Sequence, residues 1–229
     1  MTLSALAVRR ISIDCQRVLE LADSGIFWVG DDARLTHGWA IVFGCHGTPY
    51  YGGAFCFEVN FPDNYPFAPP SFVYLTNDGR TRFNPNLYKN GKVCLSLLNT
   101  WAGEQWSGIQ SLSSILQSIQ TAVINENPLE NEPAYPHATM QRDSPIYNRL
   151  ILHATLETAI LGYLKDPPAY LLPVYDAFRS WVFKARDDVL AKATELASEW
   201  DGKIETIDFY HMTQKYRFAN LAVTLQSIS

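Results

Sequence analysis

A proline-rich segment, Phe61–Pro70 (FPDNYPFAPP), constrains the fold more than any other part of the sequence. Proline has a fixed φ and no amide hydrogen, so four prolines within these ten residues exclude both a helix and a central strand. We therefore expect a stiff loop that carries Tyr65 and Phe67, with separate elements of secondary structure before and after it.

Strands are predicted on both sides of this loop. Directly before it, Ala54–Phe61 alternates between apolar and other residues, which places Phe55 and three later apolar side chains on one face. Cys56 falls on the opposite face, and we expect this thiol to be inert. Further strands are predicted at Gly25–Val29, Trp39–Phe43 and Phe72–Leu75. Four successive strands with short connections form an antiparallel meander.

Helices are predicted around the meander. Apolar residues three and four apart predict an N-terminal helix over about Leu3–Ala22, and a central helix follows Ser111, which is a suitable N-cap. Further along the chain, Ser144 and Pro145 match the cap and first residue of another helix. The predicted helices of the C-terminal part are Ser144–Lys165, Val174–Trp200 and Glu205–Ser229.

These elements predict an α+β fold in which an N-terminal helix, a four-stranded antiparallel meander and a central helix are followed by a helical C-terminal extension. A chain of 229 residues is long for one domain and short for two. We therefore expect a core over residues 1–136 and a helical extension over residues 137–229 that packs on or near it.

Composition excludes several function classes. The net charge is -5 with interspersed charges, so nucleic-acid binding is not expected, and no apolar stretch approaches the roughly 20 residues of a membrane span. The four cysteines are scattered without a CxxC pair, so we expect neither a disulfide framework nor a metal, and no cofactor. The segment Met1–Ala7 is short and precedes two arginines, unlike a secretory signal. We expect a cytoplasmic or nuclear monomer.

One cysteine lies in an unusual context. The segment Phe83–Leu98 (FNPNLYKNGKVCLSLL) places Cys94 after a run of turn-forming residues and before apolar sequence. A buried structural thiol and an exposed nucleophile both fit this local pattern. No histidine lies in a segment that must approach Cys94, which argues against a cysteine protease because that class needs a paired histidine.

A series of motifs carries a family resemblance. In order, they are the basic N-terminal helix, the YGG turn of Tyr51–Gly53, FPDNYPFAPP, NPN, GKVC, Trp106-Ser107 and the NEP turn at Asn131–Pro133. Together they resemble the catalytic core of ubiquitin-conjugating enzymes (the UBC core). The closest resemblance is to Z-type members, which share RFNPNxYxNGKVCLS, a TWxGxxWS insertion at Thr100–Ser107 and a helical C-terminal extension.

The resemblance assigns roles to the residues around Cys94. Cys94 matches the family's thioester-forming cysteine, and Asn86, eight residues earlier, matches the asparagine of the family's HPN motif. Asn84 stands where most members have histidine, as it does in the Z type. That histidine organises the loop, so this departure concerns loop geometry and leaves the chemistry unchanged.

The resemblance also implies roles for positions that meet partners. Arg9 and Arg10 are expected to contact the activating enzyme, and Phe67 and Ser107 the ligase. Glu130, Asn131 and Glu132 are expected to orient an acceptor lysine. Trp106 is expected to pack beneath the site.

The resemblance implies a UBC-like fold and an acyl carrier. Such an enzyme accepts ubiquitin or a ubiquitin-like modifier from an activating enzyme as a thioester on Cys94, and transfers it to a lysine amine, usually with a ligase. The alternative is a UBC-fold protein that binds ubiquitin or acts as a scaffold without turnover. The extension is predicted to pack as a lid on the core, to gate Cys94, or to select the activating enzyme or modifier.

Overall fold

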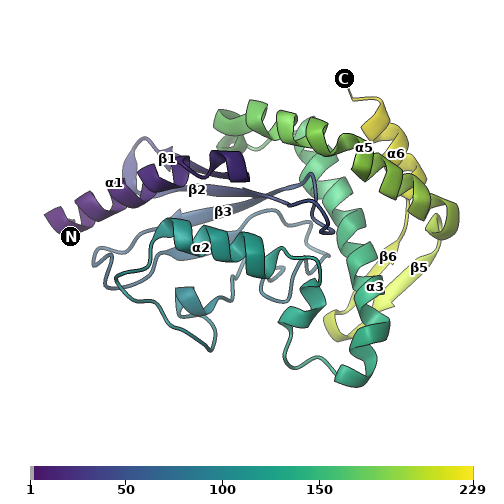
Figure 1. Cartoon of the computed structure of the whole chain (residues 1–229), viewed down its shortest axis with the longest axis horizontal. Coiled ribbons are helices and arrows are strands. Elements are labelled where there is room, and N and C mark those ends of the chain that lie inside the picture. Colours follow the sequence, from purple (N-terminus) through teal and green to yellow (C-terminus); the bar gives the residue numbers. More distant parts are fainter. Residues whose placement is uncertain (1–2, 229) are drawn as a thin grey trace.

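A computed structural model of the chain describes residues 3–228 (Figure 1). Its first half contains α1 (Ala5–Leu19), β1 (Ile26–Asp31), β2 (Arg34–Phe43), β3 (Ala54–Asn60), β4 (Ser71–Tyr74) and α2 (Leu112–Ser118). Its second half contains α3 (His137–Ala154), α4 (Tyr163–Lys165), α5 (Tyr175–Trp200), β5 (Ile204–Ile207), β6 (Met212–Lys215) and α6 (Phe218–Gln226). None of the helices in the described range is long and apolar enough to cross a membrane.

The four-stranded sheet confirms the predicted meander. Its strand order is β1-β2-β3-β4, and every neighbouring pair is antiparallel. In the β2–β3 register, Val42 lies opposite Phe55 and Ala40 opposite Phe57, so these side chains share one buried face. Helix α2 packs on this side of the sheet, and its cap is Ser111, as predicted from sequence. The predicted α+β, UBC-like fold class is therefore confirmed.

The opposite face of the sheet is covered by the C-terminal extension. Tyr170 stacks on Trp39 with ring centroids 6.3 Å apart, and Phe178 and Trp181 lie 6.0 and 5.3 Å from Phe43. Burial on this face raises the pKa of Cys56 to about 12, so its thiol stays protonated at neutral pH. The sheet is thus a middle layer between α2 and α5 (Figure 1).

The first helix of the extension begins earlier than predicted. Helix α3 starts at His137, so Ser144 is not an N-cap and Pro145 lies inside the helix. The added turns are tied to the segment just before the helix, because the buried Tyr135 donates a hydrogen bond to the buried Asp143 at 2.8 Å. The helix then continues through π-helical turns at Thr155–Gly162 into α4, which ends at Lys165 as expected.

The prediction of a helix over Glu205–Ser229 is wrong for its first half. Strands β5 and β6 form a hairpin there, with Ile204 opposite Lys215 and Ile207 opposite Met212, and α6 follows it. Ile207 and Met212 are buried, and a residue between the strands, His211, has φ +48°, which no α-helix contains. Tertiary burial therefore decides the structure here against helical propensity. The predicted end at Ser229 lies outside the described residues.

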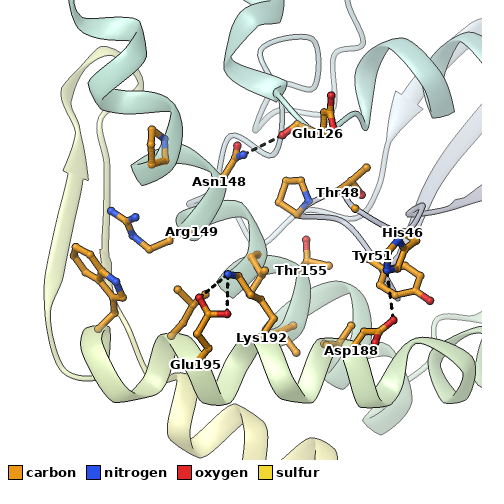
Figure 2. A pocket seen from close by; sticks show the side chains of 18 of the residues that line it. His46, Thr48, Tyr51, Glu126, Asn148, Arg149, Thr155, Asp188, Lys192 and Glu195 are labelled. Atoms are coloured by element: carbon orange, nitrogen blue, oxygen red, sulfur yellow. Dashed lines mark hydrogen bonds and ion pairs between the residues drawn. The ribbon is translucent and has the colours of Figure 1, made fainter.

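A cavity of about 680 Å³ lies between the core and the extension (Figure 2). Its walls come from the turn around Thr48, from α3 and from α5. Figure 2 shows Lys192 and Glu195 of α5 paired on its rim, at 2.8 Å.

Candidate active site

The turn at Asn84-Pro85-Asn86 is held by a buried asparagine. The Asn84 side chain is fully buried; its Oδ1 accepts a hydrogen bond from the Asn86 amide at 2.8 Å, and its Nδ2 donates to the Val123 carbonyl at 2.7 Å. Asn84 thereby ties the turn to the segment that follows α2. This geometry fits the role of loop organiser that the resemblance implies for this position.

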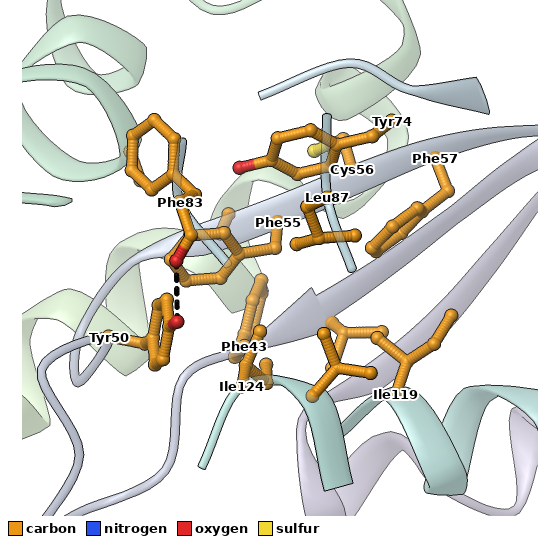
Figure 3. Close-up of a cluster of buried hydrophobic side chains, with 14 of the residues drawn as sticks. Phe43, Tyr50, Phe55, Cys56, Phe57, Tyr74, Phe83, Leu87, Ile119 and Ile124 are labelled. Atoms are coloured by element: carbon orange, nitrogen blue, oxygen red, sulfur yellow. Dashed lines mark hydrogen bonds between the residues drawn. The ribbon is translucent and has the colours of Figure 1, made fainter. Parts of the chain in front are cut away.

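A buried aromatic cluster supports the start of this turn. Figure 3 shows Tyr50, Phe55 and Phe83 packed together, with the Tyr50 hydroxyl donating to the Phe83 carbonyl at 2.6 Å. Asn84 Nδ2 also lies 3.4 Å from the Tyr50 hydroxyl. Sequence reasoning did not assign Tyr50 to the site, because Tyr50 is 33 positions before Phe83 in the sequence.

Asn86 and Cys94 are joined by two hydrogen bonds. The Cys94 amide donates to the Asn86 carbonyl at 2.8 Å, and the Asn86 side-chain amide donates to the Cys94 carbonyl at 2.7 Å. The Asn86 Oδ1 is buried and has no hydrogen-bond partner among the described residues. An asparagine amide has two donor hydrogens, so one remains for a second acceptor near Cys94.

The Cys94 side chain is enclosed. Cys94 is only 2% exposed. The following segment folds back beside it, because Thr100 Oγ1 accepts from the Leu95 amide at 2.9 Å and donates to the Val93 carbonyl at 2.8 Å. Neighbouring groups must therefore move before an acyl donor reaches the thiol. Within residues 3–228, no three His, Cys, Asp or Glu side chains are grouped in a way that could hold a metal ion.

Comparison with known proteins decides the family. The family model "Ubiquitin-conjugating enzyme" matches residues 10–151, which is more than half of the chain. The chain belongs to the ubiquitin-conjugating enzyme family. Ubiquitin-conjugating enzyme E2 Z of Xenopus tropicalis is 43% identical over 159 residues, covering 69% of this chain and 50% of that relative. The Homo sapiens protein of that name is 43% identical over 157 residues, covering 68% and 44%.

A solved structure shows the same fold. The E2 domain of a Toxoplasma gondii ubiquitin conjugating enzyme superposes with a TM-score of 0.53 at 23% identity, covering 66% of this chain and 97% of that one. The chain spans about half the length of the curated E2 Z relatives it matches. The sequence-based assignment to this family, closest to the Z type, is thus confirmed.

The three family positions predicted to orient a lysine separate in the structure. Asn131 reaches the turn at Asn84–Asn86, where its Nδ2 lies 3.5 Å from Asn84 Oδ1. The Glu132 carboxylate instead accepts a hydrogen bond from Tyr210 at 3.1 Å. Glu130 is exposed, and within residues 3–228 its carboxylate has neither a hydrogen bond nor an ion pair. Only Asn131 is joined directly to the Asn84 and Asn86 network.

The two arginines of α1 differ in their surroundings. Arg9 is exposed, as a contact to an activating enzyme requires. Arg10 pairs with the buried Asp14 at 3.1 Å and donates to the carbonyls of Gly108, at 2.7 Å, and Gln110. Arg10 therefore joins α1 to the loop after Trp106, and its guanidinium is already engaged within the chain.

The residues predicted to meet a ligase lie on two adjoining loops. Phe67 is 76% exposed and Ser107 is exposed, while Trp106 is buried and its indole nitrogen donates to the Pro66 carbonyl at 2.8 Å. This bond connects the proline-rich loop to the end of the insertion. Ile109, which sequence reasoning missed, is 92% exposed on the same loop as Ser107. Exposed apolar side chains on adjoining loops are typical of a protein contact surface.

Proposed function

We propose that this protein accepts ubiquitin or a ubiquitin-like modifier from an activating enzyme as a thioester on Cys94, and transfers it to a lysine amine, usually with a ligase. The pairing of Asn86 with Cys94 carries this proposal, since a side-chain amide donor lies beside the cysteine that the sequence resemblance matches to the family's thioester-forming residue. We further propose action in the cytoplasm or nucleus, where reducing conditions preserve a free thiol.

The first step is thiol exchange. The Cys94 thiolate attacks the carbonyl carbon of the modifier's thioester with the activating enzyme, a new carbon–sulfur bond forms, and the old one breaks. The activating enzyme leaves as a thiolate, which takes up the proton that Cys94 released. Thiols exchange efficiently with a modest thiolate fraction, so no dedicated base is needed.

The second step is aminolysis. A neutral lysine amine attacks the Cys94 thioester, and the carbonyl oxygen becomes negatively charged in the tetrahedral intermediate. The remaining amide hydrogen of Asn86 is suited to stabilise this oxygen. The carbon–sulfur bond then breaks with Cys94 leaving as a thiolate, and the lysine nitrogen gives its extra proton to solvent water. Asn131, which is bonded to the same loop, is our candidate for orienting the incoming amine.

The burial of Cys94 favours a second candidate function. A thiol that is 2% exposed is also compatible with a UBC-fold protein that binds the modifier or acts as a scaffold without forming a thioester. The two candidates differ in whether a covalent adduct forms at Cys94.

A charging assay separates them. The protein is mixed with an activating enzyme, ATP and ubiquitin, and gels are run with and without reductant. We expect a reductant-sensitive shift of one ubiquitin mass that is lost in Cys94→Ala, and a reductant-resistant adduct in Cys94→Lys. Cys45→Ala, at a half-buried cysteine outside the motif, is the matched control and should charge normally. Absence of any adduct with several activating enzymes and modifiers would favour the scaffold.

A further inference from the structure

The C-terminal hairpin reaches the segment that precedes the catalytic turn. Strands β5 and β6 lie beyond the residues that the family model matches, yet their connection packs against residues 82–90. The Arg82 amide donates to the Met212 sulfur at 3.0 Å, and Lys89 donates to the Tyr210 carbonyl at 3.3 Å. Two parts of the chain more than a hundred residues apart therefore share one contact.

Arg82 is the centre of this contact. Its guanidinium lies 3.4 Å from the Tyr88 ring centroid and 5.3 Å from that of Tyr210, so two aromatic rings orient it. It donates to the Asn84 carbonyl at 3.2 Å and to the Pro85 carbonyl at 2.5 Å. Both acceptors immediately precede Asn86, the residue that bonds to Cys94.

Helix α3 fixes the position of the hairpin. Arg149 of α3 makes a two-point contact with Glu205 of β5, at 2.5 and 2.8 Å. The Tyr147 hydroxyl of the same helix donates to the Arg82 carbonyl at 2.5 Å. At the other end of the contact, Tyr210 donates to Glu132. Both the hairpin and Arg82 are therefore anchored to the same helix.

A cavity beside Arg82 leaves room for its side chain to move. A cavity of about 320 Å³ lies between Arg82, Tyr88 and the hairpin residues Phe209 and His211. No ion pair holds the Arg82 guanidinium within residues 3–228. Without the Tyr210 ring, the arginine side chain would have room to leave the two carbonyls.

We propose that the β5–β6 hairpin is a positioning element for lysine transfer, in which Tyr210 orients Arg82 and Arg82 fixes the Asn84 and Pro85 carbonyls so that the Asn86 amide keeps its direction. Arg82 and Tyr210 are positioning residues, since neither touches the reacting atoms. This inference rests on the proposed acyl-carrier function and gives the extension a defined part in it.

The first test uses a purified thioester and free lysine in single turnover. Arg82→Lys keeps the charge but loses the planar fork that spans two carbonyls, and Tyr210→Ala removes the ring. For both, we expect the maximal transfer rate to fall on the order of 10-fold with an unchanged half-saturating lysine concentration, because the acceptor site itself is intact. Tyr210→Phe keeps the ring and should restore the rate, and Thr213→Ala, exposed on the same hairpin, is the control.

The second test is a double-mutant cycle with Asn86→Ala. If Arg82 acts through Asn86, adding Arg82→Lys to Asn86→Ala does not lower the transfer rate further. If Arg82→Lys instead causes an independent structural defect, the fold-losses of the two single variants multiply in the double variant. Tyr210→Ala serves in the same cycle if Arg82→Lys does not fold. Wild-type rates in both variants, or full multiplication in the cycle, overturn the inference while leaving the acyl-carrier function intact. Absence of a wild-type thioester with every activating enzyme overturns the proposed function itself.

Discussion

The turn before Cys94 and the C-terminal extension are held by different kinds of hydrogen bond. Asn84 and Asn86 use neutral amides that bond to backbone groups. The extension relies on charged groups: Arg149 contacts Glu205 through two hydrogen bonds, and Tyr216 donates to the same carboxylate at 2.6 Å. Neutral amides do not titrate, so their hydrogen bonds do not change with pH. Charge-assisted hydrogen bonds are stronger, but they require that the acid and base stay ionised. The hydrogen bonds that join Asn84, Asn86 and Cys94 to one another thus contain no titrating group, although the charged Arg82 also donates to the turn.

The largest expected effect comes from removing the neutral amide donor that bonds to the Cys94 carbonyl. Asn86→Ala should slow aminolysis of the thioester by about 100- to 1000-fold, because one oxyanion donor is lost. Single-turnover transfer to free lysine measures this rate. Asn220→Ala, which removes an exposed asparagine amide on α6, is the control. A loss below threefold would show that the Asn86 amide does not act in the reaction.

A smaller effect is expected at the base of the turn. Asn84→Ala leaves the Asn86 amide and the Val123 carbonyl without their partner, so the free energy of unfolding should fall by about 3 kcal/mol. Urea denaturation measures this change. Because no titrating group is removed, the deficit should be the same at pH 5.5 and pH 7.5, and a strong pH dependence would contradict the comparison.

Breaking the charged contact of the extension should cost about 2 kcal/mol. Arg149→Gln loses the charge that faces Glu205 and the stacking of the guanidinium on Trp200, which is 3.9 Å away. Thermal unfolding monitors the effect. Lys192→Ala, at the exposed pair on the cavity rim, is the matched control, with a change within about 0.5 kcal/mol. If Arg149→Gln and Lys192→Ala lowered the stability equally, the partly buried ion pair would contribute no more than the exposed one.

The smallest expected effect is a pH dependence that belongs to the extension. Burial, and then the charges of Arg217 and Arg80, lower the pKa of His153 from its ordinary 6.5 to about 4. The unfolded chain therefore binds a proton that the folded chain rejects, so the stabilising contribution is present above pH 6.5 and is lost as pH falls toward 4. Through His153, the free energy of unfolding should fall by about 1 kcal/mol as the pH is lowered from 6.5 to 5.5.

Comparison with a variant isolates this contribution. In the wild-type protein the Arg217 amide donates a hydrogen bond to His153 Nε2 at 3.1 Å. His153→Gln removes the titrating ring but keeps a side-chain acceptor for this hydrogen bond. Urea denaturation of both proteins at pH 6.5 and 5.5 gives the difference. If the free energy of unfolding changed equally between the two pH values in the wild type and in His153→Gln, His153 would not be the source of the pH dependence.

The features that could be predicted from the sequence are those that depend on local patterns or on the family motifs. Alternation identified the strand of Phe55, and the family resemblance singled out Asn86 and Cys94, two residues that are in fact bonded. Prediction failed for the β5–β6 hairpin, which is stabilised by buried contacts to distant residues. Arg82 was missed for the same reason, because Met212 lies 130 positions after it and no local motif records such a contact.

The distance in sequence between Arg82 and Met212 also bears on the order in which the site is completed during synthesis. Domains fold as their residues leave the ribosome, and contacts between distant residues form late. The residues of the meander and of the turn at Asn84 are translated well before residue 212. The support of Arg82 is therefore absent until residues 210–212 have been translated, and a chain released before that point carries Cys94 on a turn that lacks the contacts of Tyr210 and Met212.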